Sequence, residues 1–280
     1  MDTTPNSKTW FVTGASRGMG RELVEQVLAR GDRVAATLRR PEQLDDLAAR
    51  HGERLWVRAL DVTDTARLRA VVDEAFAALG RIDVVVSNAG YGVFAAAEDL
   101  TDAQIDRMIA TNLTGSIQLA RAVVPHLRAQ GGGRLLQLSS MGGHLAFPAF
   151  SLYHTTKWGI EGFFEALAEE VAPFGIDTTL IEPGMVRTGF FDAADRVPVS
   201  APYRGGPADQ EPIPVSEMTN SQENTIAAVV RAAVSANPPR RLVLGSDAWQ
   251  LMTTALRQRL ADVESQRADA ATADAVPARR

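Results

Sequence analysis

Short apolar runs and longer amphipathic segments alternate along most of this chain. Runs such as Val84-Val85-Val86 and Leu135-Leu136 are continuous, which is typical of strands buried on both faces of a parallel sheet. Between such runs, apolar residues recur three or four positions apart, as on one face of a helix. Alternating strands and helices predict right-handed βαβ crossovers. We therefore expect an α/β fold: one Rossmann-like domain with a doubly wound parallel sheet and helices on both faces.

The bounds of the predicted elements follow from these patterns and from the positions of glycine and proline. Strands are expected at 9–13, 33–38, 55–60, 83–87, 134–138, 176–181 and 241–244. Helices are expected at 20–29, 42–50, 65–79, 102–112, 115–129, 152–172, 221–236 and 248–265. We assign residues 1–265 to the domain and interpret 190–217, which lacks a clear period, as a lid over the substrate. Residues 266–280 are expected to be a disordered tail.

The composition excludes several classes of function. Of the 280 residues, 45% are hydrophobic and 22% are charged, and the formal net charge is −5 without a long basic run. This charge argues against an electrostatic nucleic-acid or membrane partner. There are no cysteines, and no two of the four histidines share a helix-face spacing, so we expect no disulfide and no metal site. Without a bilayer-spanning run or a visible signal peptide, we expect a cytoplasmic protein.

A glycine-rich turn joins the first predicted strand to the first predicted helix. Glycines in such a turn allow positive φ angles and a close approach of the backbone to phosphate, and the N–H groups that open the helix face the anion. A lone glycine cluster is often only a tight turn, but this one lies where ligands bind in a doubly wound sheet. We expect it to bind a dinucleotide through Gly14, Ser16, Arg17, Gly18, Met19 and Gly20.

The end of the second predicted strand indicates which dinucleotide binds. A site for NAD carries an acidic residue there for the ribose 2′-hydroxyl. Here Leu38 is followed by Arg39 and Arg40, and guanidinium groups suit a 2′-phosphate by charge and by bidentate geometry. Arg17 would add a further cation. We expect NADP(H) rather than NAD(H); the alternative is that Arg39 and Arg40 only solvate the end of the strand.

Tyr153 and Lys157 have a spacing that suits acid–base chemistry. On a helix, residues four apart lie on one face, one turn apart. A nearby ammonium favours the phenolate, so we expect the pKa of Tyr153 to be lowered, which suits proton exchange with an alcohol oxygen. Alone, the pair is a weak signal, but Ser140 lies thirteen residues before the tyrosine. His154 points about 100° away from Tyr153 on an ideal helix and is assigned no role.

Together these residues resemble the short-chain dehydrogenase/reductase family, in the subgroup with a T-G-x-x-x-G-x-G turn. The resemblance covers about residues 9–188. In chain order, its motifs are Thr13-Gly14 with Gly18 and Gly20, Asp61-Val62, Asn88-Ala89-Gly90, Asn112, Ser139-Ser140, Tyr153 with Lys157, and Pro183-Gly184 followed by Val186 and Thr188. The residue before Asn88 is often Asn in the family but is Ser87 here, which would change a sheet-stabilising hydrogen bond.

The resemblance implies four catalytic residues. Ser140 would hydrogen-bond the substrate oxygen, and Tyr153 would be the general acid in reduction and the general base in oxidation. Lys157 would bind the nicotinamide ribose and lower the pKa of the tyrosine. Asn112 would bend its helix and hold a water in a proton relay. The cofactor would perform the hydride chemistry, which the protein positions and polarises.

The resemblance also implies cofactor contacts outside the glycine-rich turn. Asp61 would contact the adenine with Val62 beside it, and Asn88-Ala89-Gly90 would line the ribose. The loop over the nicotinamide would comprise Pro183, Gly184, Val186 and Thr188. From the family we also expect a homodimer or a homotetramer.

The substrate site is predicted to be mostly apolar. Its expected lining residues are Met141, His144, Phe150, Met185 and Phe190. Such walls suit a hydrophobic ketone or alcohol as the small-molecule partner, so we expect a carbonyl reductase. A hydroxysteroid or retinol-type dehydrogenase is the alternative enzyme. A non-catalytic NADP(H) sensor is the alternative of another class, and the presence of both Tyr153 and Lys157 argues against it.

Overall fold

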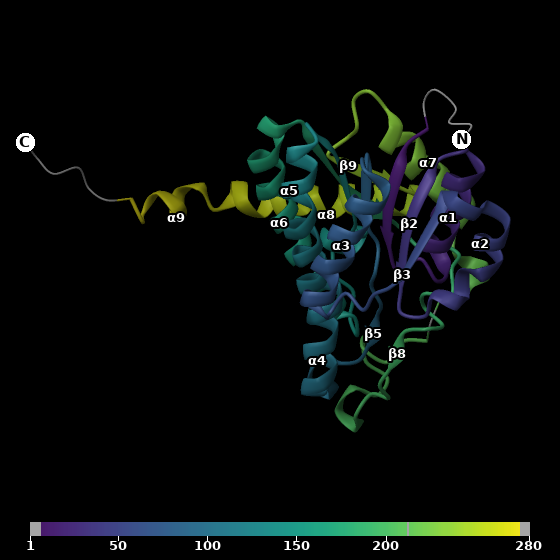
Figure 1. The fold of residues 1–280 in the computed structure, drawn as a ribbon. Helices are drawn as coiled ribbons and strands as arrows, with labels where there is room; N and C mark the ends of the chain where they lie inside the picture. The colour runs from purple at the N-terminus through teal and green to yellow at the C-terminus, as the bar shows by residue number, and fades with distance from the viewer. Residues whose placement is uncertain (1–6, 212, 275–280) are drawn as a thin grey trace, which may run out of the picture.

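The computed structural model describes residues 7–211 and 213–274 and places a parallel sheet between two layers of helices (Figure 1). The seven strands of the sheet follow the order β3-β2-β1-β4-β6-β7-β9, and all neighbouring strands are parallel. They are β1 (Thr9–Thr13), β2 (Arg33–Leu38), β3 (Leu55–Ala59), β4 (Val84–Ser87), β6 (Gly133–Leu138), β7 (Ile176–Pro183) and β9 (Arg241–Leu244). The predicted Rossmann-like, doubly wound α/β fold is confirmed.

The helices lie close to their predicted positions. They are α1 (Gly18–Ala29), α2 (Asp45–His51), α3 (Thr65–Leu79), α4 (Asp102–Met108), α5 (Gly115–Ala129), α6 (Ser151–Val171), α7 (Gln222–Val234), α8 (Ser246–Ser265) and α9 (Arg267–Ala271). Local capping explains two of the starts. The Asp64 carboxylate accepts a hydrogen bond from the backbone of Arg67 at the start of α3, and Thr101 and Gln104 form a capping box at the start of α4.

The core lies on both faces of the sheet because successive residues of each strand point to opposite sides. Trp10 and Val12 of β1 pack in the layer that contains α1 and α7. Phe11, between them, packs in the layer that contains α3, α5 and α6. All three side chains are fully buried. The continuous apolar runs of the sequence therefore reflect strands that are covered by helices on each side, as Figure 1 shows.

The segment predicted to be a lid is docked against the loop that follows β4. Strand β8 (Asp195–Arg196) pairs in parallel with β5 (Val93–Phe94) in a separate two-stranded sheet. The backbone N–H of Ser200 donates to the Asp99 carboxylate at 2.9 Å, and the Tyr203 hydroxyl donates to Glu98 at 2.7 Å. Residue 212 lies outside the described part. Strands of two residues are too short for periodicity to predict, so the sequence did not indicate this pairing.

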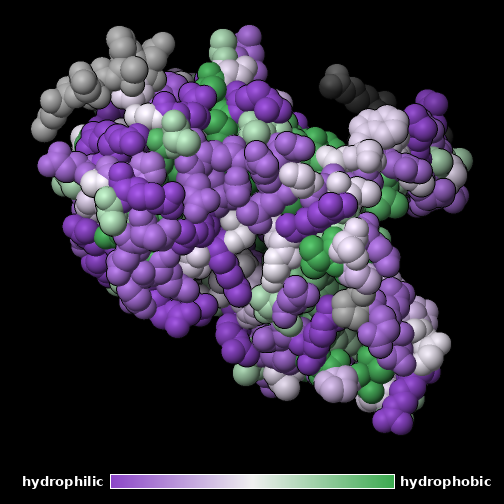
Figure 2. All heavy atoms as spheres, turned by 90° about the vertical axis from the view of Figure 1, so that its right-hand side faces the viewer, coloured by the Kyte–Doolittle hydropathy of each residue, from purple (hydrophilic) through white to green (hydrophobic). Residues whose placement is uncertain are grey.

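Figure 2 shows the side of the molecule that carries α1 and α2 in Figure 1. This face is mostly hydrophilic. It is hollowed between the main body and the lower part, which in Figure 1 bears α4, β5 and β8, and hydrophobic residues are visible in the hollow. Because β5 follows directly after β4, the hollow lies toward the carboxyl ends of the strands, where ligands bind in such sheets.

The C-terminal segment differs from its prediction. Helix α8 extends away from the body of the protein, and Arg267–Ala271 form the short helix α9 where a disordered tail was expected (Figure 1). Alanine has a high helix propensity, which allows the helical path to continue although the side chains of α9 are exposed. Residues 275–280 of the predicted tail lie outside the described residues. Within the described part, no helix is long and apolar enough to cross a membrane.

Candidate active site

The glycine-rich turn after β1 adopts the geometry that its sequence predicts. Gly14 and Gly18 have φ angles of 69° and 54°, in the region that favours glycine. A Cβ atom on Gly14 would lie 2.8 Å from the Cα of Ala89, and one on Gly20 would lie 2.3 Å from the carbonyl oxygen of Gly14. Side chains at these positions would fill the turn, which therefore presents bare backbone at the start of α1. This is a suitable cradle for a phosphate.

The segment after β4 is tied to this turn by side-chain hydrogen bonds. The Asn88 amide donates to the carbonyl oxygens of Thr13 and Gly14 at 2.9 and 3.1 Å. The Thr13 hydroxyl accepts from the backbone N–H groups of Asn88 and Ala89 at 3.0 and 3.2 Å. Gly90, the last residue of this motif, is exposed. The two predicted cofactor motifs are thus adjacent at the carboxyl ends of β1 and β4.

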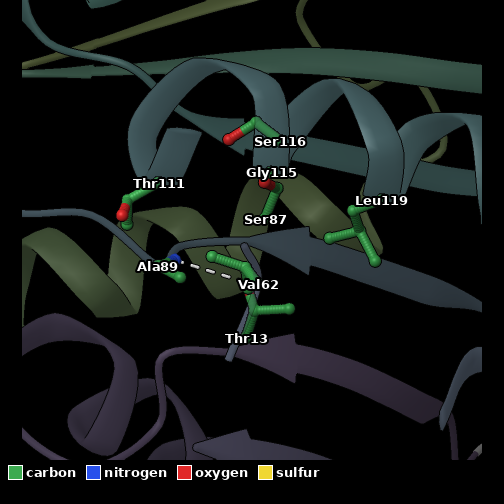
Figure 3. Close-up of a pocket in the computed structure, with 8 residues that line it drawn as sticks. All are labelled: Thr13, Val62, Ser87, Ala89, Thr111, Gly115, Ser116 and Leu119. Carbon is green, nitrogen blue, oxygen red and sulfur yellow. Dashed lines mark hydrogen bonds between the residues drawn. The ribbon is translucent and has the colours of Figure 1, made fainter. Parts of the chain in front are cut away.

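A small gap in the packing, too narrow to hold a water molecule, lies next to this junction, between the sheet and the start of α5 (Figure 3). Its lining residues are Thr13, Val62, Ser87, Ala89, Thr111, Gly115, Ser116 and Leu119. Two of these, Val62 and Ala89, belong to the predicted cofactor set. Asp61, just before Val62, is exposed, and its carboxylate accepts hydrogen bonds from the backbone and the hydroxyl of Thr63.

The arginines predicted to select the cofactor lie at the rim of the turn. Arg39 and Arg40 directly follow β2, which neighbours β1 in the sheet, and Arg17 lies inside the glycine-rich turn. All three residues are exposed. Across residues 7–211 and 213–274, none of these three arginines forms an ion pair, so their guanidinium groups are available to bind an anion. Ser16 and Met19, also in the predicted set, are partly buried in the same turn.

Asn112 lies in a distorted stretch of helix. The helix predicted at 102–112 is α-helical only to Met108, and Ile109–Thr114 form a π-helix before α5 begins. The Asn112 amide oxygen accepts from the backbone N–H of Tyr91 at 3.1 Å, and its amide nitrogen donates to the Tyr91 carbonyl at 2.8 Å. Single-turn π-helices occur frequently at functional sites. The helix is therefore irregular at Asn112, where the resemblance implies a bend, and the side chain is fixed against the segment after Gly90.

Ser140 opens a tight turn after β6. Its hydroxyl accepts a hydrogen bond from the backbone N–H of Gly142 at 3.0 Å, which starts a 3-10 turn over Met141–Gly143. The side chain is partly exposed, whereas Ser139 is buried. Of the two serines, Ser140 is therefore the more accessible from outside the protein.

Tyr153 lies in the first turn of α6 with only 8% of its surface exposed. Its ring stacks on that of Phe150, with centroids 4.2 Å apart. Burial raises the pKa of Tyr153 to about 12, and the neighbouring Ser140 hydroxyl acts in the lowering direction. The predicted lowering of this pKa is therefore wrong, because the helix spacing revealed neither the burial of the ring nor the direction of the lysine.

The Lys157 side chain points toward the carboxyl end of β6 as well as toward the Tyr153 ring. Its ammonium nitrogen donates to the carbonyl oxygen of Leu138 at 2.9 Å and lies 5.4 Å from the centroid of the Tyr153 ring. Burial lowers the pKa of Lys157 to about 8, while the Glu161 carboxylate acts to raise it. Serine, tyrosine and lysine thus converge at the carboxyl end of β6, as predicted.

Aromatic side chains cover one side of Tyr153. Phe94 stacks on Phe150 at 4.2 Å, extending the stack that includes Tyr153, and the Phe190 ring meets Tyr153 edge-on at 5.7 Å. Phe191 adds an edge-on contact to Phe190. Phe150 and Phe190, which are both predicted to line the substrate site, therefore lie against the Tyr153 ring. Phe190 belongs to the segment predicted to be the lid, so this segment reaches the site.

Met141 and Met185, which are both predicted to line the substrate site, pack in a different hydrophobic cluster from Tyr153. Met141 belongs to a small cluster with Ala248 and Met252 of α8, and Met185 packs against that cluster. The cluster is separate from the aromatic group around Tyr153. The sequence showed that both methionines are apolar. It did not show that Ala248 and Met252 of α8 would pack with them.

The loop after β7 is held by two residues that the sequence analysis did not select. The Asp247 carboxylate accepts from the backbone N–H of Met185 and from the Asn220 amide, each at 2.8 Å. A Cβ atom on Gly184 would lie 2.3 Å from this carboxylate. Pro183, the last residue of β7, is buried, as are Val186 and Thr188 of the loop. Asp247 and Asn220 come from distant parts of the sequence, so no local motif could have revealed them.

His144 does not line the substrate site as predicted. Its Nε2 atom lies 3.0 Å from a Glu182 carboxylate oxygen and 2.9 Å from Nη1 of Arg241. Glu161 lies in the same group, and ligand atoms of His144, Glu161 and Glu182 all lie within 4.8 Å of one another, a spacing that would suit a metal ion. The Arg241 guanidinium contacts both carboxylates and supplies positive charge there.

His154, which was assigned no role, is buried and holds the loop that follows Ser140. Its Nδ1 atom lies 2.9 Å from the carbonyl oxygen of Gly142, and its Nε2 atom accepts from the backbone N–H of Phe147 at 2.9 Å. A Cβ atom on Gly142 would lie 2.8 Å from the imidazole. Burial lowers the pKa of His154, which favours the neutral ring that these two hydrogen bonds require.

Comparisons of sequence and of structure with known proteins point to one family. The family model described as short chain dehydrogenase matches residues 8–196. The chain is 41% identical over 247 residues to Oxidoreductase BOA17 of Botryotinia fuckeliana (strain B05.10), covering 86% of this chain and 90% of that protein. A short-chain dehydrogenase structure from Streptomyces avermitilis superposes with a TM-score of 0.90 and 35% identity, covering 97% of this chain and 100% of that one.

A second solved structure, a metagenomic short-chain oxidoreductase in complex with NADP, is similar with a TM-score of 0.69 and 26% identity. The match covers 85% of this chain and 96% of that chain. The family model spans well over half of the sequence, and it includes every residue of the serine, tyrosine and lysine group. The chain therefore belongs to the short chain dehydrogenase family.

Proposed function

We propose that this protein is an NADP(H)-dependent carbonyl reductase that converts a hydrophobic ketone or aldehyde to an alcohol. The observation that carries the proposal is the convergence of Ser140, Tyr153 and Lys157 at the same edge of the sheet as a backbone turn that only glycine can form. Bound NADPH would supply the hydride. The chain itself has to hold the carbonyl, deliver a proton to its oxygen and exclude water.

Ser140 and Tyr153 act on the carbonyl oxygen. The serine hydroxyl donates a hydrogen bond to it, which stabilises the negative charge that develops on the oxygen during reduction. The phenol of Tyr153 then transfers its proton to that oxygen. With a pKa of about 12, Tyr153 is protonated throughout the neutral range, so it is an acid ready for the reduction direction. Lys157, one helical turn away, places positive charge beside the phenolate that results.

The residues present fit NADP(H). The bare backbone of the glycine-rich turn suits a diphosphate, and Arg17 and Arg39 offer exposed guanidinium groups for a 2′-phosphate. No carboxylate directly follows β2, where NAD sites carry one. The NADP found in the similar metagenomic oxidoreductase supports the same choice.

The aromatic wall supports a hydrophobic substrate. Phe150 and Phe190 flank the phenol of Tyr153, and the lid segment that carries Phe190 is fixed by hydrogen bonds to Glu98 and Asp99. Such a wall suits an uncharged, hydrophobic ketone and would exclude water from the proton transfer.

The proposal is tested by following NADPH absorbance with a panel of hydrophobic ketones and diketones. We expect carbonyl-dependent oxidation of NADPH. Tyr153→Phe should lose nearly all turnover while it binds NADPH with unchanged affinity, as measured by fluorescence titration. A Tyr153→Phe protein with wild-type kcat would refute the assigned mechanism. NADPH binding without turnover on any carbonyl would favour the sensor function instead.

A further inference from the structure

A row of stacked side chains leads away from the phenol of Tyr153 and ends at a cation. The rings of Tyr153 and Phe150 stack with their centroids 4.2 Å apart, and Phe150 stacks in turn on Phe94, again at 4.2 Å. The Arg196 guanidinium lies over the Phe94 ring, with its Cζ atom 4.5 Å from the centroid. We name these four side chains the aromatic row. It joins the proposed proton donor to an arginine that the proposed reaction does not use.

The aromatic row is extended. The rings of Tyr153 and Phe150 are 13° from parallel, and those of Phe150 and Phe94 are 2° from parallel. Two rings stacked at such distances cannot share one face of Phe150, so Tyr153 and Phe94 lie on opposite faces of it. By the same exclusion, Arg196 lies on the face of Phe94 that Phe150 leaves open. Steps of 4.2, 4.2 and 4.5 Å thus follow one another, a span that an extended chain of roughly ten atoms can cover.

Backbone pairing holds Arg196 at the outer end of the row. It belongs to β8, where it is the direct partner of Phe94 of β5, and the backbone N–H of Val197 donates to the Phe94 carbonyl at 2.9 Å. The neighbouring Asp195 points to the other face of this small sheet, because successive strand residues alternate. Both strands lie in the lower part of the molecule in Figure 1, which borders the hollow of Figure 2.

The charge of Arg196 is not used by the fold. The side chain is exposed, and it forms no ion pair with any residue in 7–211 or 213–274. Stacking on a ring leaves the edge of the guanidinium open, and this edge carries the N–H donors. Because the ring and the strand already fix the side chain, it loses less conformational freedom when it binds an anion.

The lid segment follows the row along its length. The Phe190 ring meets Tyr153 edge-on at 5.7 Å, and the Phe191 ring is tilted against Phe94 at 5.9 Å. Phe190 and Phe191 also contact each other edge-on at 5.4 Å. Two successive lid residues thus reach the inner ring and the outer ring of the row. An apolar chain that follows these rings from Tyr153 ends at Arg196.

We propose that the substrate is a keto acid of medium chain length. Its carbonyl meets Ser140 and Tyr153, its apolar chain follows the aromatic row, and its terminal carboxylate binds Arg196. One guanidinium matches the single charge and the two oxygens of a carboxylate through two parallel N–H···O bonds. The aromatic wall still receives only the uncharged part of the substrate. This inference deepens the proposed carbonyl reduction and rests on it for the position of the carbonyl.

Matched substrates separate the effect of the charge from that of the chain. The test pair is a straight-chain keto acid, with its carbonyl roughly ten atoms from its carboxylate, and the methyl ester of the same acid. We expect kcat/KM to be about tenfold higher for the acid than for the ester, and this preference to shrink as salt is raised from about 0.05 M to about 0.5 M. Levulinate, whose chain is too short to reach the arginine, should show no preference over its methyl ester.

The decisive variant is Arg196→Gln, which removes the charge and keeps a planar group over Phe94. We expect kcat/KM for the long keto acid to fall about tenfold and that for its methyl ester to stay at the wild-type value. Arg196→Lys keeps the charge without the planar fork and should retain part of the preference. Arg204→Gln, at another exposed arginine of the lid segment, is the control and should change neither value. Equal losses for acid and ester in Arg196→Gln would mean that the arginine only covers the ring, and would overturn the proposal.

A binding measurement distinguishes this proposal from the proposed function. Decanoate has no carbonyl to reduce, so calorimetry in the presence of NADPH measures the carboxylate contact without turnover. Wild-type protein should bind decanoate about tenfold more tightly than decanamide, and Arg196→Gln should bind the two alike. Such selectivity in a protein that reduces no carbonyl would refute the reduction and leave the carboxylate contact standing. Reduction of ketones with no preference for the long acid, and no selectivity for decanoate, would refute the carboxylate contact alone.

Discussion

Nδ1 of His154 lies 2.9 Å from the carbonyl oxygen of Gly142, in the turn that begins at Ser140. The carbonyl requires a proton on Nδ1, so Nε2 is free of one and can accept the N–H of Phe147 at 2.9 Å. His154, next to the proposed catalytic Tyr153, thus fixes the loop that begins at the proposed catalytic Ser140. A protonated imidazole cannot accept the hydrogen bond from Phe147, so this pair of hydrogen bonds requires a neutral ring.

Replacing His154 should therefore misplace Ser140. We expect His154→Phe to lower kcat for ketone reduction about a hundredfold, as small misplacements of catalytic groups do, with little change in the KM for NADPH. His154→Gln retains a donor and an acceptor and should recover part of the rate. His126→Gln, at a histidine that pairs with Asp73 on the surface, is the control and should match the wild type.

Acid should destabilise the protein through the same histidine. Because burial lowers the pKa of His154 below the ordinary value of 6.5, the folded protein binds its proton less readily than the unfolded chain does. The stability that this group contributes is present above pH 6.5 and is lost as pH falls through the lower pKa of the folded state. Thermal unfolding between pH 7 and pH 5 should show a smaller decrease in Tm for His154→Gln than for the wild type. Equal decreases in the two proteins would contradict this assignment.

Ketone reduction should decline in alkaline solution because of Lys157 rather than Tyr153. The pKa of Lys157 is about 8 and that of Tyr153 is about 12, so rising pH removes the ammonium long before the phenol proton. We expect kcat for reduction to fall as pH rises through about 8, measured at saturating NADPH. A rate that stays constant up to pH 10 would show that the lysine charge is not needed.

Cofactor preference should depend on Arg39. Its guanidinium is exposed directly after β2 and suits the 2′-phosphate that distinguishes NADPH from NADH. We expect Arg39→Ala to raise the KM for NADPH about tenfold, equivalent to about 1.4 kcal/mol, and to leave the KM for NADH unchanged. Arg257→Ala, which removes an exposed arginine on α8, should change neither value. A lower KM for NADH than for NADPH in the wild type would reverse the assignment.

Phe190 should contribute to binding of the carbonyl substrate. The ring meets Tyr153 edge-on at 5.7 Å, and it belongs to the segment that docks on Glu98 and Asp99. Phe190→Ala removes a large apolar surface, so we expect the KM for a hydrophobic ketone to rise about tenfold while NADPH binding is unchanged. Ile213→Ala, at an exposed position of the same segment, is the control. Unchanged ketone kinetics in Phe190→Ala would show that the lid is not part of the site.

Local sequence patterns determined the fold and the proposed catalytic group. Continuous apolar runs revealed the strands, as at Val84-Val85-Val86, because a strand covered on both faces has no polar side. The glycine turn and the Ser140, Tyr153 and Lys157 group were also readable, because strand and helix geometry fix where residues at such spacings lie. The bend near Asn112 was implied only by the family resemblance, and the π-helix at Ile109–Thr114 agrees with it.

Tertiary structure alone decided the surroundings of these groups. His144 pairs with Glu182 and Arg241 instead of joining the substrate wall, because these two residues come from strands far away in the sequence. The pKa of Tyr153 moved opposite to the prediction, because burial depends on the packing of Phe150 around the ring and not on the spacing to Lys157. Short-range geometry repeats with every turn of helix or pair of strand residues, so sequence spacing predicts it. Burial and charge pairing arise from contacts between distant segments, and these exist only once the chain has folded.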